Sequence, residues 1–211
     1  AFASGWNPND FIVSPETFTD LKKVWKDRIP VVQELWRQRA VTFLNGAGEP
    51  VAVKTFPPPV QPEPNVWLTA TRAAETFEHA GHHGYNVLTM LMGSGLDELT
   101  EKIAIYRRAR EQAGFDPATG VISLMLHTFV HPDGEFVRQQ VRDPFHQYIS
   151  TAISSHAQAA KGRPQPSPDE LARLAELSFE RYSRTAALIG TPDEAIAGVK
   201  KFAAAGVNEI A

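Results

Sequence analysis

The sequence predicts a parallel α/β fold, a (β/α)₈ barrel of which about strands 4 to 8 are present. Short, almost continuously apolar runs alternate with helical patterns along most of the 211 residues. Such runs are typical of parallel strands that are covered on both faces. We count five of them, whereas a complete barrel takes roughly 250 residues. The rival fold is an open doubly wound sheet, which is disfavoured because no Gly-x-Gly-x-x-Gly turn follows any run.

The chain opens with a predicted strand and a predicted amphipathic helix. Residues 1–6 are counted as the first of the five strands. Residues 17–37 carry apolar side chains at three- and four-residue steps among charged ones, which is the helical period. Pro30 lies inside this pattern, and we expect it to kink or split the helix.

A hairpin and a proline-rich connector come next. Two strand-like runs around a turn-rich loop predict a hairpin within residues 41–56. Residues 57–64 contain five prolines in eight positions, which predicts an extended connector. We treat residues 41–64 as an insertion into one partial barrel domain that covers residues 1–211.

Strands and helices alternate after the connector. The remaining strands are predicted as the apolar runs at residues 66–70, 86–92, 121–130 and 207–211. Capping residues and apolar spacing predict helices at residues 74–82, 96–113, 134–157 and 169–188, and a last helix that residues 190–194 open and that runs to residue 205. We treat residues 134–188 as a helical insertion into the barrel.

Composition narrows the classes of partner and chemistry. The formal charge is −3, so nucleic acid and anionic membranes are not expected partners. No apolar run approaches the roughly 20 residues that a membrane span needs. The chain has no cysteine, which excludes disulfides, thiolate zinc sites and cysteine nucleophiles and suits a reducing compartment. We therefore expect a cytoplasmic protein.

Candidate ligand-binding residues follow the predicted strands, because a parallel barrel binds ligands at the carboxyl ends of its strands. The side chains there are aromatic, small or hydrogen-bonding, with one cation. They are Trp6, Asn7, Thr69, Ala70, Thr71, Arg72 and Gly93. This set fits a flat, partly apolar, phosphorylated ligand. The alternatives are a tryptophan in the core, a capped helix with a solvated arginine, and an ordinary loop at Gly93.

His127 is the candidate catalytic residue. It lies towards the end of an apolar predicted strand, where a polar group costs free energy unless it has a partner. It is either a hydrogen-bonded core histidine or a proton donor, base or anion-binding group.

Two further motifs are weaker. His79, His82 and His83 have metal-like spacing, but no acid lies nearby, and histidines are favourable at a helix C-terminus. We therefore predict no metal site. Residues 190–194 could present free amides to an anion, but a plain capped helix start explains them better.

The sequence resembles the bacterial luciferase-like flavin monooxygenases, in particular the branch associated with nonribosomal peptide and polyketide biosynthesis. The matching segments occur in family order. They are residues 3–11, 64–70 with 75–77, 86–89, 124–130 and 189–194. Family members carry about three more barrel strands before the first segment.

The resemblance implies an enzyme that uses reduced FMN, supplied by a separate flavin reductase, and O₂ to oxygenate a small organic molecule. It places Trp6 and Asn7 beside the flavin, residues 69–72 near its phosphate, and His127 in the active site. A homodimer is expected, and assembly-line carrier domains are candidate partners. The alternatives are a deazaflavin-dependent oxidoreductase and a non-catalytic flavin-binding or scaffold fragment.

Overall fold

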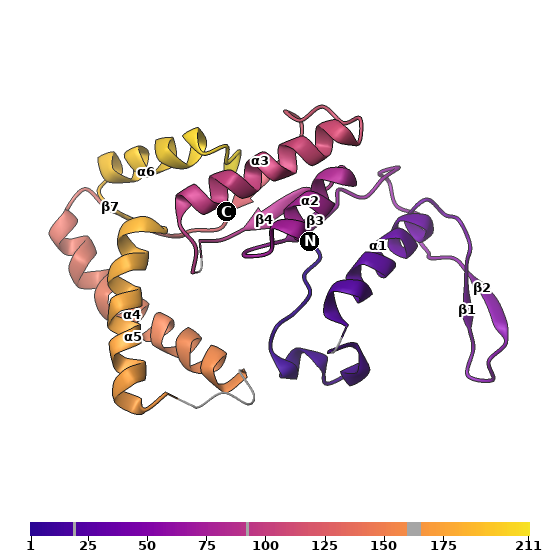
Figure 1. Cartoon of the computed structure of the whole chain (residues 1–211), viewed down its shortest axis with the longest axis horizontal. Helices are drawn as coiled ribbons and strands as arrows, with labels where there is room; N and C mark the ends of the chain where they lie inside the picture. Colours follow the sequence, from indigo (N-terminus) through magenta and orange to yellow (C-terminus); the bar gives the residue numbers. More distant parts are fainter. Residues whose placement is uncertain (19, 92, 160–165) are drawn as a thin grey trace. The chain divides into compact units, whose positions relative to one another are not determined.

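The computed structural model describes residues 1–18, 20–91, 93–159 and 166–211. The chain divides into two compact units, Ala1–Val66 and Trp67–Ala211. Figure 1 shows the elements of both units and labels most of them. That all 211 residues form one domain stays a prediction. Among the residues described, no helix is long and apolar enough to cross a membrane.

The first unit holds short helices, one long helix and a hairpin. Its elements are two 3₁₀ helices, η1 (Pro8–Phe11) and η2 (Pro15–Phe18), then α1 (Leu21–Trp36), β1 (Val41–Leu44) and β2 (Pro50–Val53). The predicted hairpin is confirmed, since β1 and β2 pair antiparallel with Val41 opposite Val53. Helix α1 runs through Pro30 as one element and is not split there.

The predicted strand over residues 1–6 is wrong. Only Phe2 forms an isolated bridge. Gly5 has a φ of +73°, which turns the chain out of an extended path. Asn7 then caps η1, so the segment ends in a helical turn.

The second unit has parallel sheets with helices between their strands. Its elements in chain order are β3 (Trp67–Thr69), α2 (Ala74–His82), β4 (Asn86–Thr89), α3 (Leu96–Gln112), β5 (Ile122–Leu124), β6 (His127–Val130), α4 (Gly134–Ala159), α5 (Pro168–Thr185), β7 (Ala187–Gly190), α6 (Pro192–Ala204) and β8 (Glu209–Ile210). One sheet has the order β3-β4-β5-β8 and the other pairs β6 with β7, and every pair is parallel. This arrangement is consistent with part of a (β/α)₈ barrel.

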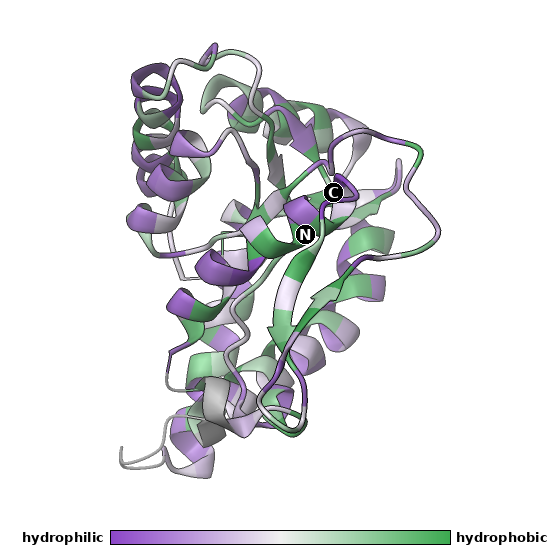
Figure 2. Ribbon diagram, turned by 90° about the vertical axis from the view of Figure 1, so that its right-hand side faces the viewer, coloured by the Kyte–Doolittle hydropathy of each residue, from purple (hydrophilic) through white to green (hydrophobic). Residues whose placement is uncertain are grey.

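The larger sheet buries one face more completely than the other. Leu68, Val87 and Ile122 point to one face and are at most 1% exposed. Thr69 and Leu88, on the opposite face, are half-buried. In Figure 2 the strands are mostly hydrophobic, whereas the helices carry both hydrophobic and hydrophilic residues. Ser123, which pairs with Leu88 on that face, is 1% exposed, so the second face is also covered but less completely at β3 and β4.

Two strand boundaries differ from the prediction. The run at 121–130 is two strands rather than one, because Leu126 N–H bonds to the Ala211 carbonyl while His127 begins the pairing with β7. The predicted helix over 169–188 is wrong at its end: α5 stops at Thr185, and Ala187–Gly190 form β7. Residues 187–190 pair with β6 and therefore do not continue the helix.

Helices α4 and α5 lie side by side between β6 and β7 in the chain (Figure 1). They make up most of the helical insertion predicted over residues 134–188. The last two residues of that range belong to β7 instead. The predicted break between them falls largely on residues 160–165, and the end of the predicted strand at Met92 likewise lies outside the described residues.

Candidate functional site

The carboxyl ends of β3 and β4 lie next to each other in the sheet. β3 ends at half-buried Thr69, and the next residue, Ala70, donates its N–H to the Leu88 carbonyl of β4 at 3.0 Å. Thr71 and Arg72 follow in the loop that leads to α2. The structure therefore puts the predicted residues 69–72 at a strand end, where a parallel sheet binds its ligands.

Arg72 and Gly93 are brought together by these two strand ends. A Cβ atom on residue 93 would overlap the Arg72 guanidinium, and Gly93 has a φ of +75° that favours glycine. Arg72 is exposed, and within the described part of the chain it has no carboxylate partner. The space next to the candidate residue Gly93 is thus taken by an arginine side chain without a described carboxylate partner.

Helix α3 begins at Leu96, three residues after Gly93. Its N-cap is Gly95, so no side chain caps the first-turn amides. Ser94, the residue between them, is only 7% exposed. Free amides and the positive end of the helix dipole add to the Arg72 cation and make this corner favourable for an anion. Asp97 and Glu98 in the first turn work against it.

Lys102 is a residue of this corner that the sequence analysis missed. Its ammonium group donates to the Thr71 carbonyl at 2.9 Å and pairs with Glu98 at 2.6 Å, and the residue is 5% exposed. It therefore neutralises one first-turn acid and fixes the loop that carries Arg72. The i,i+4 spacing of Glu98 and Lys102 was the only local signal, and it is typical of surface pairs.

Trp6 and Asn7 belong to the first unit and are described within it. Trp6 is 48% exposed. The Asn7 side-chain oxygen accepts from the Asn9 N–H at 2.9 Å, and the Asp10 carboxylate accepts from the Asn7 N–H at 3.2 Å. Asn7 thus has a capping role, and only its amide NH₂ is left for a ligand. That Trp6 and Asn7 line one pocket with Thr69 to Arg72 stays a prediction.

His127 lies in an aromatic cluster formed by β6, α4 and α5. Its ring centroid is 5.1 Å from that of Phe145, 4.6 Å from Tyr148 and 5.6 Å from Tyr182. It is the first residue of β6, so its predicted place near a strand's carboxyl end is corrected. Burial lowers the pKa of His127, which favours the neutral imidazole.

The imidazole is not a hydrogen-bonded core histidine. Its Nδ1 atom is buried, yet no described residue, side chain or backbone, hydrogen-bonds to it. Of the two predictions for His127, the one that leaves a nitrogen available for chemistry agrees better with this geometry.

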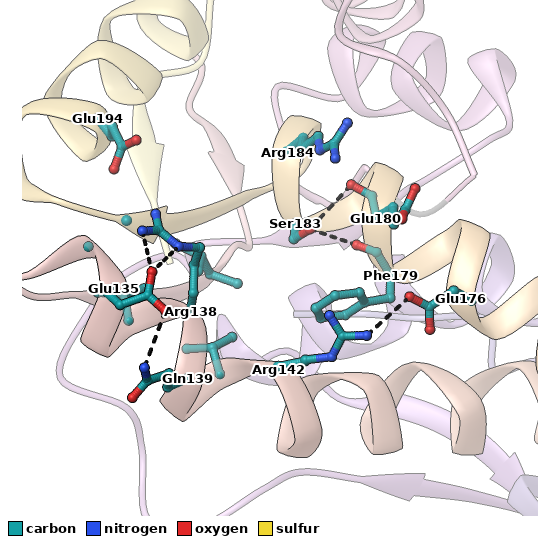
Figure 3. Close-up of a pocket in the computed structure, with 15 residues that line it drawn as sticks. Glu135, Arg138, Gln139, Arg142, Glu176, Phe179, Glu180, Ser183, Arg184 and Glu194 are labelled. Atoms are coloured by element: carbon teal, nitrogen blue, oxygen red, sulfur yellow. Dashed lines mark hydrogen bonds and ion pairs between the residues drawn. The ribbon is translucent and has the colours of Figure 1, made fainter.

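A cavity lined by charged residues lies elsewhere in the second unit, between α4, α5, the end of β7 and the start of α6 (Figure 3). Its volume is about 690 Å³. Two of the arginines that line it pair with acids, Arg138 with Glu135 at 2.6 Å and Arg142 with Glu176 at 3.7 Å. None of the predicted site residues lines it.

The two weaker motifs have structural roles in the described residues. Thr191 and Glu194 form a capping box at α6, and hydrogen bonds from Thr191 hold the pKa of Glu194 below its usual range. The carboxylate thus takes the place that an anion would need. The His79 and His83 rings stack at 4.0 Å, and within the described ranges no three metal-binding side chains gather.

The sequence model of the family described as Luciferase-like monooxygenase matches residues 2–209. The chain belongs to the luciferase-like monooxygenase family. No curated protein matches the sequence. The family match agrees with the partial (β/α)₈ barrel that the sequence predicted.

Solved structures share the luciferase-like fold over most of this chain. Monooxygenase RslO1 from Streptomyces bottropensis is 22% identical with a TM-score of 0.70, and the match covers 100% of this chain and 59% of RslO1. An F420-dependent secondary alcohol dehydrogenase in complex with an F420-acetone adduct is 18% identical with a TM-score of 0.71. That match covers 99% of this chain and 61% of the dehydrogenase.

A third similar structure is the oxygenating constituent of 3,6-diketocamphane monooxygenase from the CAM plasmid of Pseudomonas putida, in complex with FMN. It is 16% identical with a TM-score of 0.64, and the match covers 90% of this chain and 56% of that one. At such identities the likeness shows the fold alone. This luciferase-like chain spans about three-fifths of the length of these proteins.

Proposed function

We propose that this chain is the flavin-binding part of a monooxygenase that uses reduced FMN and O₂ to insert one oxygen atom into an organic substrate. The observation that carries the proposal is the Arg72 guanidinium, free of any described carboxylate and held against Gly93 at the start of α3. Membership of a monooxygenase family supports the reaction class.

The residues at this corner fit the phosphate of FMN. Arg72 would donate to phosphate oxygens, and the absence of a side chain at Gly93 leaves room for its guanidinium. The uncapped amides of α3 add neutral donors. The hydroxyls of Thr69 and Thr71 are further donors at the same strand end. Residues 69–72 and Gly93 are therefore our candidate cofactor-binding residues, together with Trp6 and Asn7 beside the flavin ring.

His127 is our candidate catalytic residue. Bound reduced FMN supplies the electrons with which O₂ is activated, and one oxygen atom goes to the substrate while the other leaves as water. The neutral imidazole can hold or accept a proton at Nδ1, because that atom has no competing partner in the described residues. The rings of Phe145 and Tyr182 around it limit access of water to this proton transfer.

A second candidate is an F420-dependent oxidoreductase. The observation that favours it is the TM-score of 0.71 to an F420-dependent alcohol dehydrogenase, similar to the 0.70 for a monooxygenase. A non-catalytic flavin-binding or scaffold fragment is the third candidate.

A binding titration separates these candidates. FMN and F420 are each titrated into the protein while cofactor fluorescence is followed. We expect FMN to bind at least about tenfold more tightly than F420, a difference of about 1.4 kcal/mol. A preference for F420 would select the oxidoreductase, and no binding of either cofactor would contradict both. If FMN binds, anaerobic photoreduction followed by air tests whether the bound flavin reacts with O₂, which the non-catalytic fragment need not do.

We further infer a cytoplasmic protein that receives reduced FMN from a separate reductase, acts as a homodimer, and serves natural-product biosynthesis with carrier domains as partners. The cysteine-free sequence is compatible with a reducing compartment. The segment resemblances given above support the biosynthetic role. Copurification with a flavin reductase tests the reductase partner, and the mass of the protein in solution tests the homodimer.

A further inference from the structure

Two buried polar atoms without a hydrogen-bond partner belong to the same aromatic cluster. They are Nδ1 of His127 and the hydroxyl oxygen of Tyr182, and both statements refer to the described residues. Tyr182, on α5, is 5% exposed, and its ring meets that of His127 edge to face with centroids 5.6 Å apart. A buried polar group that lacks a partner lowers stability, so a folded protein seldom keeps two of them together without a use.

The surroundings define what such a site would bind. Phe145 contacts both rings, with centroid distances of 5.1 Å to His127 and 5.7 Å to Tyr182. Burial is the cause of the lowered pKa of His127, and it also raises the pKa of Tyr182, an effect to which the nearby Tyr148 adds. The imidazole and the phenol are therefore both neutral, and an apolar neighbourhood of this kind disfavours a charged ligand group.

Neutral hydrogen-bonding groups complement this pair. The Tyr182 hydroxyl can donate to an oxygen, and a neutral imidazole nitrogen accepts from a hydroxyl or donates to a carbonyl according to its tautomer. A hydroxyl or carbonyl oxygen of a ligand therefore suits either residue as a partner. The surrounding rings suit a flat apolar body behind that oxygen. Tyr148, the third ring against His127, is 43% exposed, so the cluster meets solvent on this side.

We propose that His127 and Tyr182 together bind the neutral hydroxyl or carbonyl oxygen of a flat organic substrate, with Tyr182 as a substrate-positioning residue. The proposal deepens the proposed monooxygenase function and rests on it, because the bound molecule is a substrate only if the protein is a monooxygenase. The binding site itself needs no flavin. Tyr182 was not a sequence candidate, because in the sequence it is one more apolar position of an amphipathic helix.

The test uses two probes of the same shape. 2-Naphthol and naphthalene differ by one hydroxyl, and their binding is measured by equilibrium dialysis. We expect the wild type to bind 2-naphthol at least about tenfold more tightly, because a site built to hydrogen-bond a hydroxyl rejects the analogue that lacks it. Tyr182→Phe and His127→Leu should each reduce this preference to roughly twofold or less, since one partner of the oxygen is lost.

A matched variant and a stability readout separate this site from a merely structural role. Tyr106 is also buried, but its hydroxyl donates to the Tyr85 carbonyl at 2.8 Å. Tyr106→Phe should therefore lower the melting temperature and keep the 2-naphthol preference. Tyr182→Phe should keep or raise the melting temperature of the ligand-free protein and lose the preference.

Several results would overturn the proposal: equal binding of both probes by the wild type, an unchanged preference in Tyr182→Phe, or a lowered melting temperature of that variant. An FMN titration of the same proteins keeps the two proposals apart. FMN binding without a 2-naphthol preference contradicts only the substrate site. A 2-naphthol preference without FMN binding contradicts the proposed flavin function.

Discussion

Arg72 and Gly93 lie in direct contact at the carboxyl ends of β3 and β4, where a Cβ atom on residue 93 would overlap the guanidinium. The contact joins the loop after one strand to the loop after its neighbour. It also sets the arginine beside the uncapped start of α3. A cation and free amides thus come together because two parallel strands end side by side.

Gly93→Ala should displace Arg72. The new methyl group overlaps the guanidinium, and a φ of +75° is unfavourable for alanine, so we expect a loss of about 1 kcal/mol or more in the free energy of unfolding. FMN affinity should fall by roughly tenfold, as expected for the loss of one charge-assisted hydrogen bond. Urea unfolding and FMN titration measure the two effects. Gly46→Ala, in the loop between β1 and β2, is the control, because nothing lies within 4 Å of its added Cβ. Equal effects of both changes would contradict the account.

Tyr106→Phe should destabilise the second unit. The Tyr106 hydroxyl donates to the Tyr85 carbonyl at 2.8 Å, and both residues are buried. Removing the donor leaves that carbonyl without its partner, so the free energy of unfolding should fall by about 1–2 kcal/mol. Urea denaturation checks this value. Tyr148→Phe, at a 43% exposed ring, should change it by less than about 0.5 kcal/mol. Similar losses in both variants would mean that the hydrogen bond contributes little.

His127 should make stability depend on pH in the weakly acidic range. Burial lowers the pKa of His127 in the folded protein below its ordinary value of 6.5. As the pH falls, this histidine is therefore protonated in the unfolded chain before it is protonated in the folded protein. Its contribution to stability is thus complete above pH 6.5 and is lost as the pH falls towards the folded pKa. In His127→Gln the unfolding free energy should fall less between pH 7 and pH 5.5. Urea unfolding at several pH values measures this slope.

Phe145→Leu is the matched control for that slope. It alters a buried ring in contact with His127 without removing a titratable group. We expect it to lower stability by a similar amount at each pH and to keep the wild-type slope. If His127→Gln also kept that slope, burial would not be acting on the histidine.

Local patterns predicted most of the second unit's elements. Helix α2 has the predicted bounds, Ala74–His82, because its apolar positions repeat at helical spacing and a loop with Gly84 follows. Strand β7 was not predicted. The four residues Ala187–Gly190 continue the apolar character of α5, and only their pairing with β6 makes them a strand. Short strands next to helices are defined by a partner that lies far away in the sequence.

The candidate site was predictable in its parts but not in its contacts. Arg72 and Gly93 were both expected at strand ends, whereas their contact depends on the β3–β4 register. Lys102 was missed because its spacing from Glu98 is that of an ordinary surface pair, although it is buried and bonds to Thr71. Such roles follow from tertiary packing, which no local pattern contains.

The central claim is that the corner at Arg72 holds the phosphate of FMN. Riboflavin has the same ring system without the phosphate, so isothermal titration of both ligands into the wild type and Arg72→Gln isolates that group. We predict that the wild type prefers FMN by at least about tenfold and that Arg72→Gln loses most of this preference. Equal affinities for FMN and riboflavin in the wild type, or an unchanged preference in Arg72→Gln, would contradict the claim.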